Sequence, residues 1–189
     1  MIPLVAQARW DSPLGPLTLA ATEAGLAGAW FDGQKHHPGP LGLPFDARQR
    51  FIAQAIEELQ AYFAGAPDGF RVALDLHGTP FQRAVWRALL QIGPGATSTY
   101  ARLAASVGRP AASRAAGAAV GRNPVSVIVP CHRVLGRDGG LTGYAGGLPR
   151  KAWLLRLEGA PMSATQESMT NPQDPAGHDG GAFTTVAAL

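Results

Sequence analysis

A change in hydrophobic pattern near residue 78 constrains the fold of this chain more than any other feature. Within 1–35, short apolar runs alternate with turn sequences such as Asp11-Ser12-Pro13, a pattern typical of β-strands. Beyond residue 78, apolar residues recur mainly at helical spacing. The pattern predicts an α+β fold with two domains, a mixed α/β domain at 1–78 and a mostly helical domain at 79–160.

One helix and one further strand are predicted in the first domain after the initial strands. Asp46 is the expected N-cap, with Gln49 at the third helical position, and apolar residues then repeat at helical spacing as far as Gly65. Between 70 and 76, apolar and polar residues alternate, which predicts a half-buried strand.

Four helices are predicted in the second domain. Thr79 and Gln82 form a capping box for the first, and the others are expected at 100–107, at 111–120 and from Pro149 onward. The middle two helices, joined by a Gly-containing turn, resemble a helix-turn-helix. Pairs of short helices are also common as simple packing units, so this pattern alone does not establish DNA binding.

The ends of the chain and its composition narrow the class of protein. Residues 161–189 are rich in small and polar residues without hydrophobic periodicity, which predicts a disordered tail. No apolar run approaches the roughly 20 residues that span a bilayer, and no secretory signal opens the chain. We expect a cytoplasmic protein with no membrane partner.

Positive charge is concentrated in the second domain. Residues 80–160 hold eleven Lys or Arg against two acids, Asp138 and Glu158, a net charge of +9, whereas 1–79 and 161–189 each carry −3. Such a field attracts polyanions, nucleic acid first among them. The alternative is an Arg-rich domain with no polyanionic partner.

Cys131 is the only cysteine, so an internal disulfide and a Cys-rich metal site are excluded; we expect neither metal nor cofactor. Its thiolate would be a nucleophile, and the positive charges of Arg122 and Arg133 would favour that form. The apolar run 125–129 before it, interpreted as a strand, is equally typical of a buried structural cysteine.

Two further residues could complete a reactive site around the thiol. Glu158 falls on the apolar side of the last predicted helix, where a carboxylate needs a partner. Pairing with His132 would give a nucleophile, a base and an orienting acid; pairing with Arg156 or Lys151 is the alternative. Asn123 lies in a turn where it could brace the preceding helix against the cysteine segment, or merely end that helix.

Seven short motifs follow one another through the second domain. They are Thr79-Pro80-Phe81-Gln82, Ser98-Thr99-Tyr100, Arg114, Arg122-Asn123-Pro124, Pro130-Cys131-His132-Arg133-Val134, Gly143-Tyr144-Ala145-Gly146-Gly147 and Leu157-Glu158-Gly159. In this order they resemble the active-site domain of the methylated-DNA–protein-cysteine methyltransferases, which repair O6-alkylguanine. The first 78 residues loosely resemble that family's N-terminal domain, a ribonuclease H-like sheet with a helix, and the second domain its winged-helix-like part.

The resemblance implies a role for each matching residue. Cys131 would accept the alkyl group, His132 would take the thiol proton through a water, Glu158 would hold the imidazole, and Tyr100 would donate a hydrogen bond to the flipped guanine. Arg114 would enter the duplex in place of that base. The complete set implied for substrate or DNA binding is Arg114, Asn123, Arg122, Arg133, Tyr144, Ala145 and Gly146.

The resemblance implies that the protein transfers one alkyl group irreversibly to its own cysteine from O6-alkylguanine in double-stranded DNA, and less well from O4-alkylthymine. It also implies a protein that is a monomer in solution. The size of the alkyl group and cooperation along DNA stay open. Two other functions fit part of the pattern. A Cys-His-Glu hydrolase would turn over repeatedly, and a DNA-binding regulator would carry a purely structural cysteine.

Overall fold

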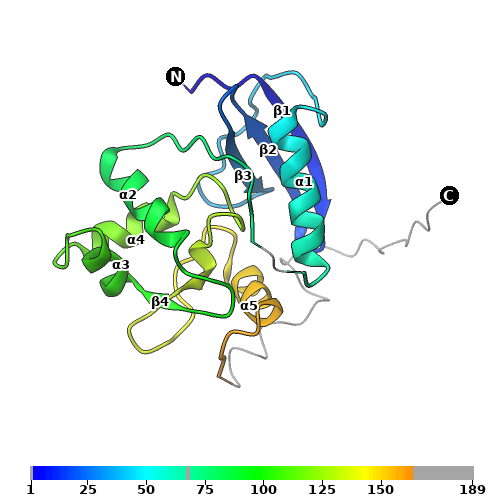
Figure 1. Ribbon diagram of the computed structural model, residues 1–189. Helices are drawn as coiled ribbons and strands as arrows, with labels where there is room; N and C mark the ends of the chain where they lie inside the picture. Colours follow the sequence, from blue (N-terminus) through cyan, green and yellow to red (C-terminus); the bar gives the residue numbers. More distant parts are fainter. Residues whose placement is uncertain (1, 67–68, 164–189) are drawn as a thin grey trace.

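The computed structural model describes residues 2–66 and 69–163. Three antiparallel strands, β1 (Ala6–Ser12), β2 (Gly15–Ala21) and β3 (Leu26–Phe31), form a sheet in the order β1-β2-β3. Helix α1 (Arg50–Phe63) packs on this sheet (Figure 1). The β structure predicted within 1–35 is therefore present, as three strands.

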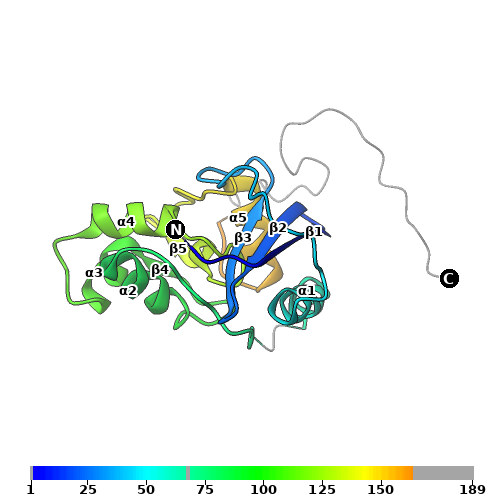
Figure 2. The same cartoon turned by 90° about the horizontal axis from the view of Figure 1, so that it is seen from above.

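The remaining helices are α2 (Pro80–Leu89), α3 (Tyr100–Ser106), α4 (Ser113–Gly121) and α5 (Leu148–Leu157). Helices α2, α3 and α4 contact one another and gather on one side of the sheet, away from α1 (Figures 1 and 2). The α3–α4 pair is the predicted helix-turn-helix unit. The whole is the mixed α+β fold expected from the sequence.

Two short parallel strands, β4 (Ser98–Thr99) and β5 (Val134–Leu135), join the start of α3 to the segment after the cysteine. The capping box before α2 forms as predicted, with Thr79 accepting from the backbone of Gln82 and the Gln82 side chain accepting from the backbone of Thr79. Thr99 caps α3 in the same way, through the backbone N–H of Arg102.

The N-cap predicted for α1 is wrong. The helix begins at Arg50, and its cap is Gln49, whose side-chain oxygen accepts from the N–H groups of Phe51 (2.8 Å) and Ile52 (3.1 Å). Asp46 instead accepts from the backbone of Arg48 in the turn before the helix. Both are local side-chain-to-backbone bonds, so the sequence pattern did not distinguish the turn from the cap.

The strand predicted at 70–76 is also absent as a strand. Its backbone is extended but meets β3 only at Leu26, which donates to Ala73 (2.8 Å) and accepts from Asp75 (2.9 Å). Further along β3, Ala29 pairs with the segment 124–126 instead, donating to the carbonyl of Pro124 and accepting from the N–H of Ser126. The segments 70–76 and 124–126 thus pair with different parts of the same edge of β3, and neither forms a continuous ladder with it.

The apolar run 125–129 is not the strand that we predicted. Val129 donates to the carbonyl of Val125 within a tight turn, and Val127 lies at a positive φ of 71°. A β-branched residue rarely adopts that conformation, and the surrounding packing holds it there. The run is apolar because it is core, and it leads into a single 3₁₀ turn, η1 (Cys131–Arg133).

Helix α5 joins the two parts of the molecule. Its Arg150 donates to the carbonyl of Leu14 in the β1–β2 turn (2.8 Å), and its Trp153 packs against Phe63 at the end of α1. One continuous hydrophobic core runs from the sheet and α1 through α2 and α4 to Cys131. Burial of this apolar surface holds the two parts together.

The structure bears on two further predictions, the absence of a membrane span and the disordered tail, only for the residues that it describes. Within 2–66 and 69–163, each helix is too short or too polar to traverse a bilayer. Most of the tail predicted to be disordered, 164–189, lies outside the described residues.

Replacing Gln49 by Ala removes the oxygen that caps α1. We expect the free energy of unfolding to fall by about 1 kcal/mol, the usual cost of a lost N-cap. Urea unfolding followed by circular dichroism measures the change. Asp46→Ala is the matched control, since its partner is the exposed backbone of a turn. An equal loss in the two variants would contradict the assignment of Gln49 as the cap.

Candidate active site

The thiol of Cys131 is buried at the start of η1, with 3% of the residue exposed. Its sulfur accepts a hydrogen bond from the Nδ2 atom of Asn123 at 3.0 Å. The same amide group donates to the carbonyl of Val129 (2.8 Å), while its Oδ1 atom accepts from the N–H of Val125 (3.0 Å). Asn123 therefore holds the strained turn and the sulfur in one geometry, inside the protein.

His132 and Glu158 lie in contact behind the cysteine. The Nε2 atom of His132 is 2.9 Å from the Oε1 atom of Glu158, and the two side chains are 0% and 1% exposed. Because a carboxylate only accepts, the imidazole proton lies on Nε2. Its other nitrogen, Nδ1, is buried and has no hydrogen-bond partner within the described residues. Nδ1 is thus the free basic position of the ring.

The carboxylate of Glu158 gathers three further donors. Arg133 reaches both of its oxygens, with Nε to Oε2 at 2.9 Å and Nη2 to Oε1 at 2.7 Å, and the hydroxyl of Tyr62 donates to Oε1 at 2.7 Å. Burial by itself would raise the pKa of Glu158, but the hydrogen bonds from His132 and Arg133 outweigh it and lower the pKa to about 2. The group is a carboxylate at every physiological pH.

The position of Arg133 corrects the expectation that it contacts DNA. Its side chain is 8% exposed, it is paired with Glu158, and its Nη1 atom donates to the carbonyl of Ile92. A guanidinium engaged in this way has no surface to offer to a phosphate. Arg133 is a structural partner of the carboxylate.

The thiol is less acidic than the sequence suggested. Burial raises the pKa of Cys131, and the hydrogen bond from Asn123 and the nearby charge of Lys151 offset this only in part. Burial also lowers the pKa of His132. Arg133, which we expected to favour the thiolate, is neutralised by Glu158. The resting pair is therefore a neutral thiol beside a neutral imidazole.

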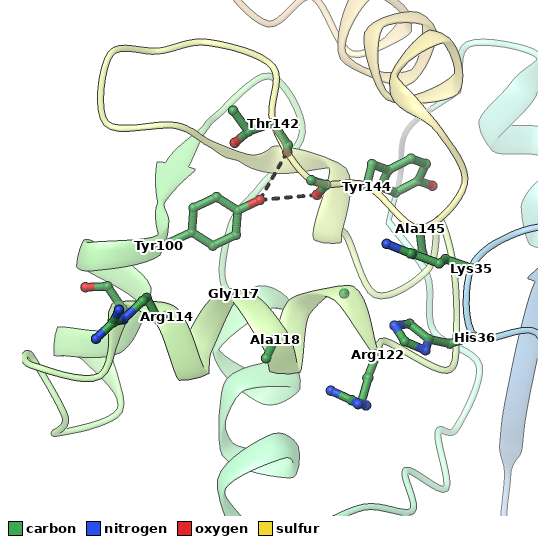
Figure 3. A pocket seen from close by; sticks show the side chains of 13 residues that line it. Lys35, His36, Tyr100, Arg114, Gly117, Ala118, Arg122, Thr142, Tyr144 and Ala145 are labelled. Carbon is green, nitrogen blue, oxygen red and sulfur yellow. Dashed lines mark hydrogen bonds between the residues drawn. The ribbon is translucent and has the colours of Figure 1, made fainter.

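A cavity of about 620 Å³ opens next to this site, between α3, α4 and the Gly-rich loop 136–147. Arg114 lies at one end, and Lys35, His36 and Arg122 lie at the other (Figure 3). Other predicted site residues in its lining are Tyr100, Tyr144 and Ala145. Gly146 lies beside the cavity wall, where a Cβ atom would meet the ring of Tyr144 at 2.7 Å.

Cys131 and His132 are not in that lining. The hydroxyl of Tyr100 crosses from α3 to the Gly-rich loop and donates to the carbonyls of Thr142 (3.1 Å) and Gly143 (3.2 Å) (Figure 3). Burial raises the pKa of Tyr100 and of Tyr144, both in the lining, and the nearby Cys131 adds to each rise. The thiol and the cavity are thus neighbours separated by the cavity wall.

Three residues at the site were missed by sequence reasoning. Lys151 is buried, donates to the carbonyls of Val134 and Thr142 (2.6 Å), and has its pKa lowered by burial to about 8. Its spacing from the apolar residues of α5 could have revealed it, as it revealed Glu158. Tyr62 and Lys35 come from the other domain, and no local pattern linked them to the cysteine.

Within the described residues, no group of three or more His, Cys, Asp or Glu side chains could hold a metal ion. The side chains of this site can by themselves perform nucleophilic attack by sulfur, with proton transfer to an oriented imidazole.

Replacing Glu158 by Gln leaves the buried guanidinium of Arg133 without a neutralising charge. We expect the variant to lose about 3–5 kcal/mol of stability at neutral pH, the usual cost of breaking a buried ion pair from one side. Urea unfolding measures this loss, with the exposed Glu57→Gln as the control.

The stability loss should depend on pH. The folded pKa of about 2 lies below the ordinary value of 4.5, so the contribution of Glu158 is complete above 4.5 and is lost as the pH falls from there through 2. The gap between wild type and Glu158→Gln should therefore narrow between pH 6 and pH 3. A constant gap would contradict an ionised Glu158.

Comparison with known proteins places the chain in a family. The ribonuclease-like domain of 6-O-methylguanine DNA methyltransferase matches residues 7–76, and the DNA-binding domain of the same family matches residues 80–160. A methylated-DNA–protein-cysteine methyltransferase from Mycolicibacterium paratuberculosis is 48% identical over 148 residues, 78% of this chain and 88% of the relative. One from Methanosarcina barkeri is 46% identical over 151 residues, 78% and 93% of the two chains.

A solved structure has the same fold. The crystal structure of the Mycobacterium tuberculosis protein OGT in complex with DNA superposes with a TM-score of 0.77 at 43% identity, covering 88% of this chain and all of that one. Both domains, the identity and the coverage agree. The chain belongs to the methylated-DNA–protein-cysteine methyltransferases, a family of enzymes that repair alkylated DNA.

Proposed function

We propose that this protein takes the alkyl group from O6-alkylguanine in double-stranded DNA onto the sulfur of Cys131, once per chain and irreversibly, and that O4-alkylthymine reacts less well. The observation that carries the proposal is the contact of His132 with Glu158 beside a lone, amide-bound thiol. The family's activity supports the reaction class.

The atoms of the step balance without a cofactor. The sulfur of Cys131 attacks the alkyl carbon, a C–S bond forms, and the C–O6 bond breaks. The thiol proton passes through a water to Nδ1 of His132, whose Nε2–H is already held by Glu158. The bond electrons leave with guanine, and Tyr100 stabilises the purine anion by hydrogen bonding. The product is a thioether, which nothing in the site hydrolyses, so each chain reacts once.

The neutral resting state of the thiol suits this sequence of events. A thiol with a raised pKa is a poor nucleophile until a base takes its proton, and His132, with a lowered pKa, is uncharged and able to accept it. The thiolate is then generated next to the bound alkyl group. Lys151 lies close enough to stabilise its charge.

A base inside a duplex cannot reach a buried thiol, so the alkylated nucleotide is extruded into the cavity. The cavity of about 620 Å³ is large enough for a purine, and Tyr100 and Tyr144 offer aromatic surface there. Arg114, at the other end of α4 from Arg122, would fill the gap in the duplex. Asn123 acts from inside the protein, on the sulfur.

Binding of the guanine by Tyr100 requires its hydroxyl to give up its present partners on the Gly-rich loop. The hydroxyl that would serve the guanine is engaged by Thr142 and Gly143 in the free protein, and both residues line the cavity. The hydroxyl has one hydrogen, shared between the two carbonyls, and transferring it to the guanine exchanges one hydrogen bond for another at little cost.

The proposal predicts one alkyl group per chain. Incubation with a duplex that contains O6-methylguanine should add a single methyl to the intact mass, and Cys131→Ser should remain unmodified. Excess substrate should not raise the yield above one. A wild-type protein without adduct would overturn the transferase function, and repeated turnover would favour a hydrolase.

Arg114→Ala should slow repair of duplex DNA at least tenfold and leave the reaction with O6-methylguanine as a free base nearly unchanged, because a free base needs no extrusion. Arg71→Ala, on the exposed surface of the first domain, is the matched control. Equal slowing on both substrates would contradict a role in base flipping.

Affinity of the wild type for undamaged duplex should fall steeply as salt rises, since binding rests on phosphate contacts. Filter binding or fluorescence anisotropy over a salt series measures the slope. A flat response would exclude a phosphate-based interface.

A further inference from the structure

Tyr62 lies on α1, in the domain that does not carry the cysteine, yet its hydroxyl reaches the carboxylate that orients the base. The Oη atom is 2.7 Å from Oε1 of Glu158, and the residue is buried, with 4% exposed. The two residues are 96 positions apart in the chain. This is a direct bond between the two domains at the centre of the site.

The bond is made by a protonated tyrosine. Burial, followed by the charge of Glu158, raises the pKa of Tyr62 far above its usual range. Arg133 is the only described cation whose charge opposes this rise. Tyr62 is therefore a permanent donor, and it cannot release its proton to the thiol or to the purine.

The packing around the ring fixes the direction of the hydroxyl. The ring of Tyr62 meets Phe63 edge-on at 5.3 Å and Phe70 at 5.4 Å between centroids. Aromatic contacts of this kind leave the ring one orientation. The hydroxyl is held on Oε1, the same oxygen that receives Nε2 of His132 and Nη2 of Arg133.

We propose that Tyr62 is a positioning residue for the alkyl transfer, through which the first domain sets the orientation and the basicity of His132. The inference rests on the proposed function. By donating to Oε1, Tyr62 draws charge away from the atom that accepts the imidazole proton, and it adds a fixed donor that holds this oxygen in place. The ring of His132 thereby keeps its orientation toward Glu158. Its affinity for a second proton stays low.

Removal of the Tyr62 hydroxyl should change the pKa of His132 in one direction, upward. In Tyr62→Phe, the negative charge on Oε1 is less dispersed, so Glu158 stabilises the imidazolium more strongly and the pKa of His132 rises. The groups that face this pair are otherwise unchanged: Arg133 on η1, Lys151 on α5, and Tyr144 on the Gly-rich loop. The acid limb of the pH–rate profile should move to higher pH.

The test uses the full chain and single-turnover kinetics with duplex O6-methylguanine, with the methylated fraction read by intact mass from pH 5 to 9. We expect Tyr62→Phe to react at least about tenfold more slowly at pH 8, the order expected for the loss of one hydrogen bond to a charged group, with its acid limb displaced upward. Phe70→Leu is the matched control, since it disturbs the packing of the Tyr62 ring without removing the hydroxyl. Its acid limb should stay in place.

A second measurement does not depend on the reaction. The imidazole proton resonances of His132, titrated by NMR in wild type and in Tyr62→Phe, should show a higher midpoint in the variant. Thermal unfolding of the same samples verifies that each is folded.

The outcomes distinguish a failure of the proposed alkyl transfer from a failure of the positioning role of Tyr62. A wild type that forms no adduct overturns the proposed function, whatever Tyr62 does. A wild type that reacts, with a Tyr62→Phe variant of unchanged rate and unchanged His132 titration, overturns the positioning role alone. Equal displacement of the acid limb in Tyr62→Phe and Phe70→Leu would also overturn it, because packing would then explain the effect.

Discussion

The buried carboxylate of Glu158 is the interaction on which the rest of the site depends. It is 1% exposed, and it is kept ionised only because three residues from two elements donate to it: Tyr62 on α1, and His132 and Arg133 on η1. An ionised group in a protein interior is tolerated only with this kind of complete pairing. The same pairing joins the two domains and fixes the tautomer of the imidazole.

The divided edge of β3 is the second constraint. One part of this edge holds Asp75 and its neighbours, which lead out of the first domain, and the other holds Ser126, which leads into the cysteine turn. The segment that leads to the cysteine is therefore positioned by a strand of the first domain, although the sequence motif of the cysteine lies wholly in the second domain. Ser126 strengthens this contact by donating to Gln34 (3.0 Å).

Much of the secondary structure and much of the site could be predicted from the sequence. Cap chemistry is local, which is why Thr79 was identified correctly and why the helix that it opens is where we expected. The mistakes at 70–76 and 125–129 share one cause. An apolar or alternating run reports burial, and it does not report whether another strand edge is free to form a ladder.

The sequence by itself determined the family, the helices and strands near most turns, and the candidate residues of the site, because motifs and periodicities are properties of neighbouring residues. Tertiary structure decided the environment of those groups. It buried Cys131 and left it protonated, turned Arg133 inward onto Glu158, clasped the Gly-rich loop with Tyr100, and brought Tyr62 to the carboxylate. Burial and contact between distant segments set a pKa, and neither quantity is encoded in any short stretch of the chain.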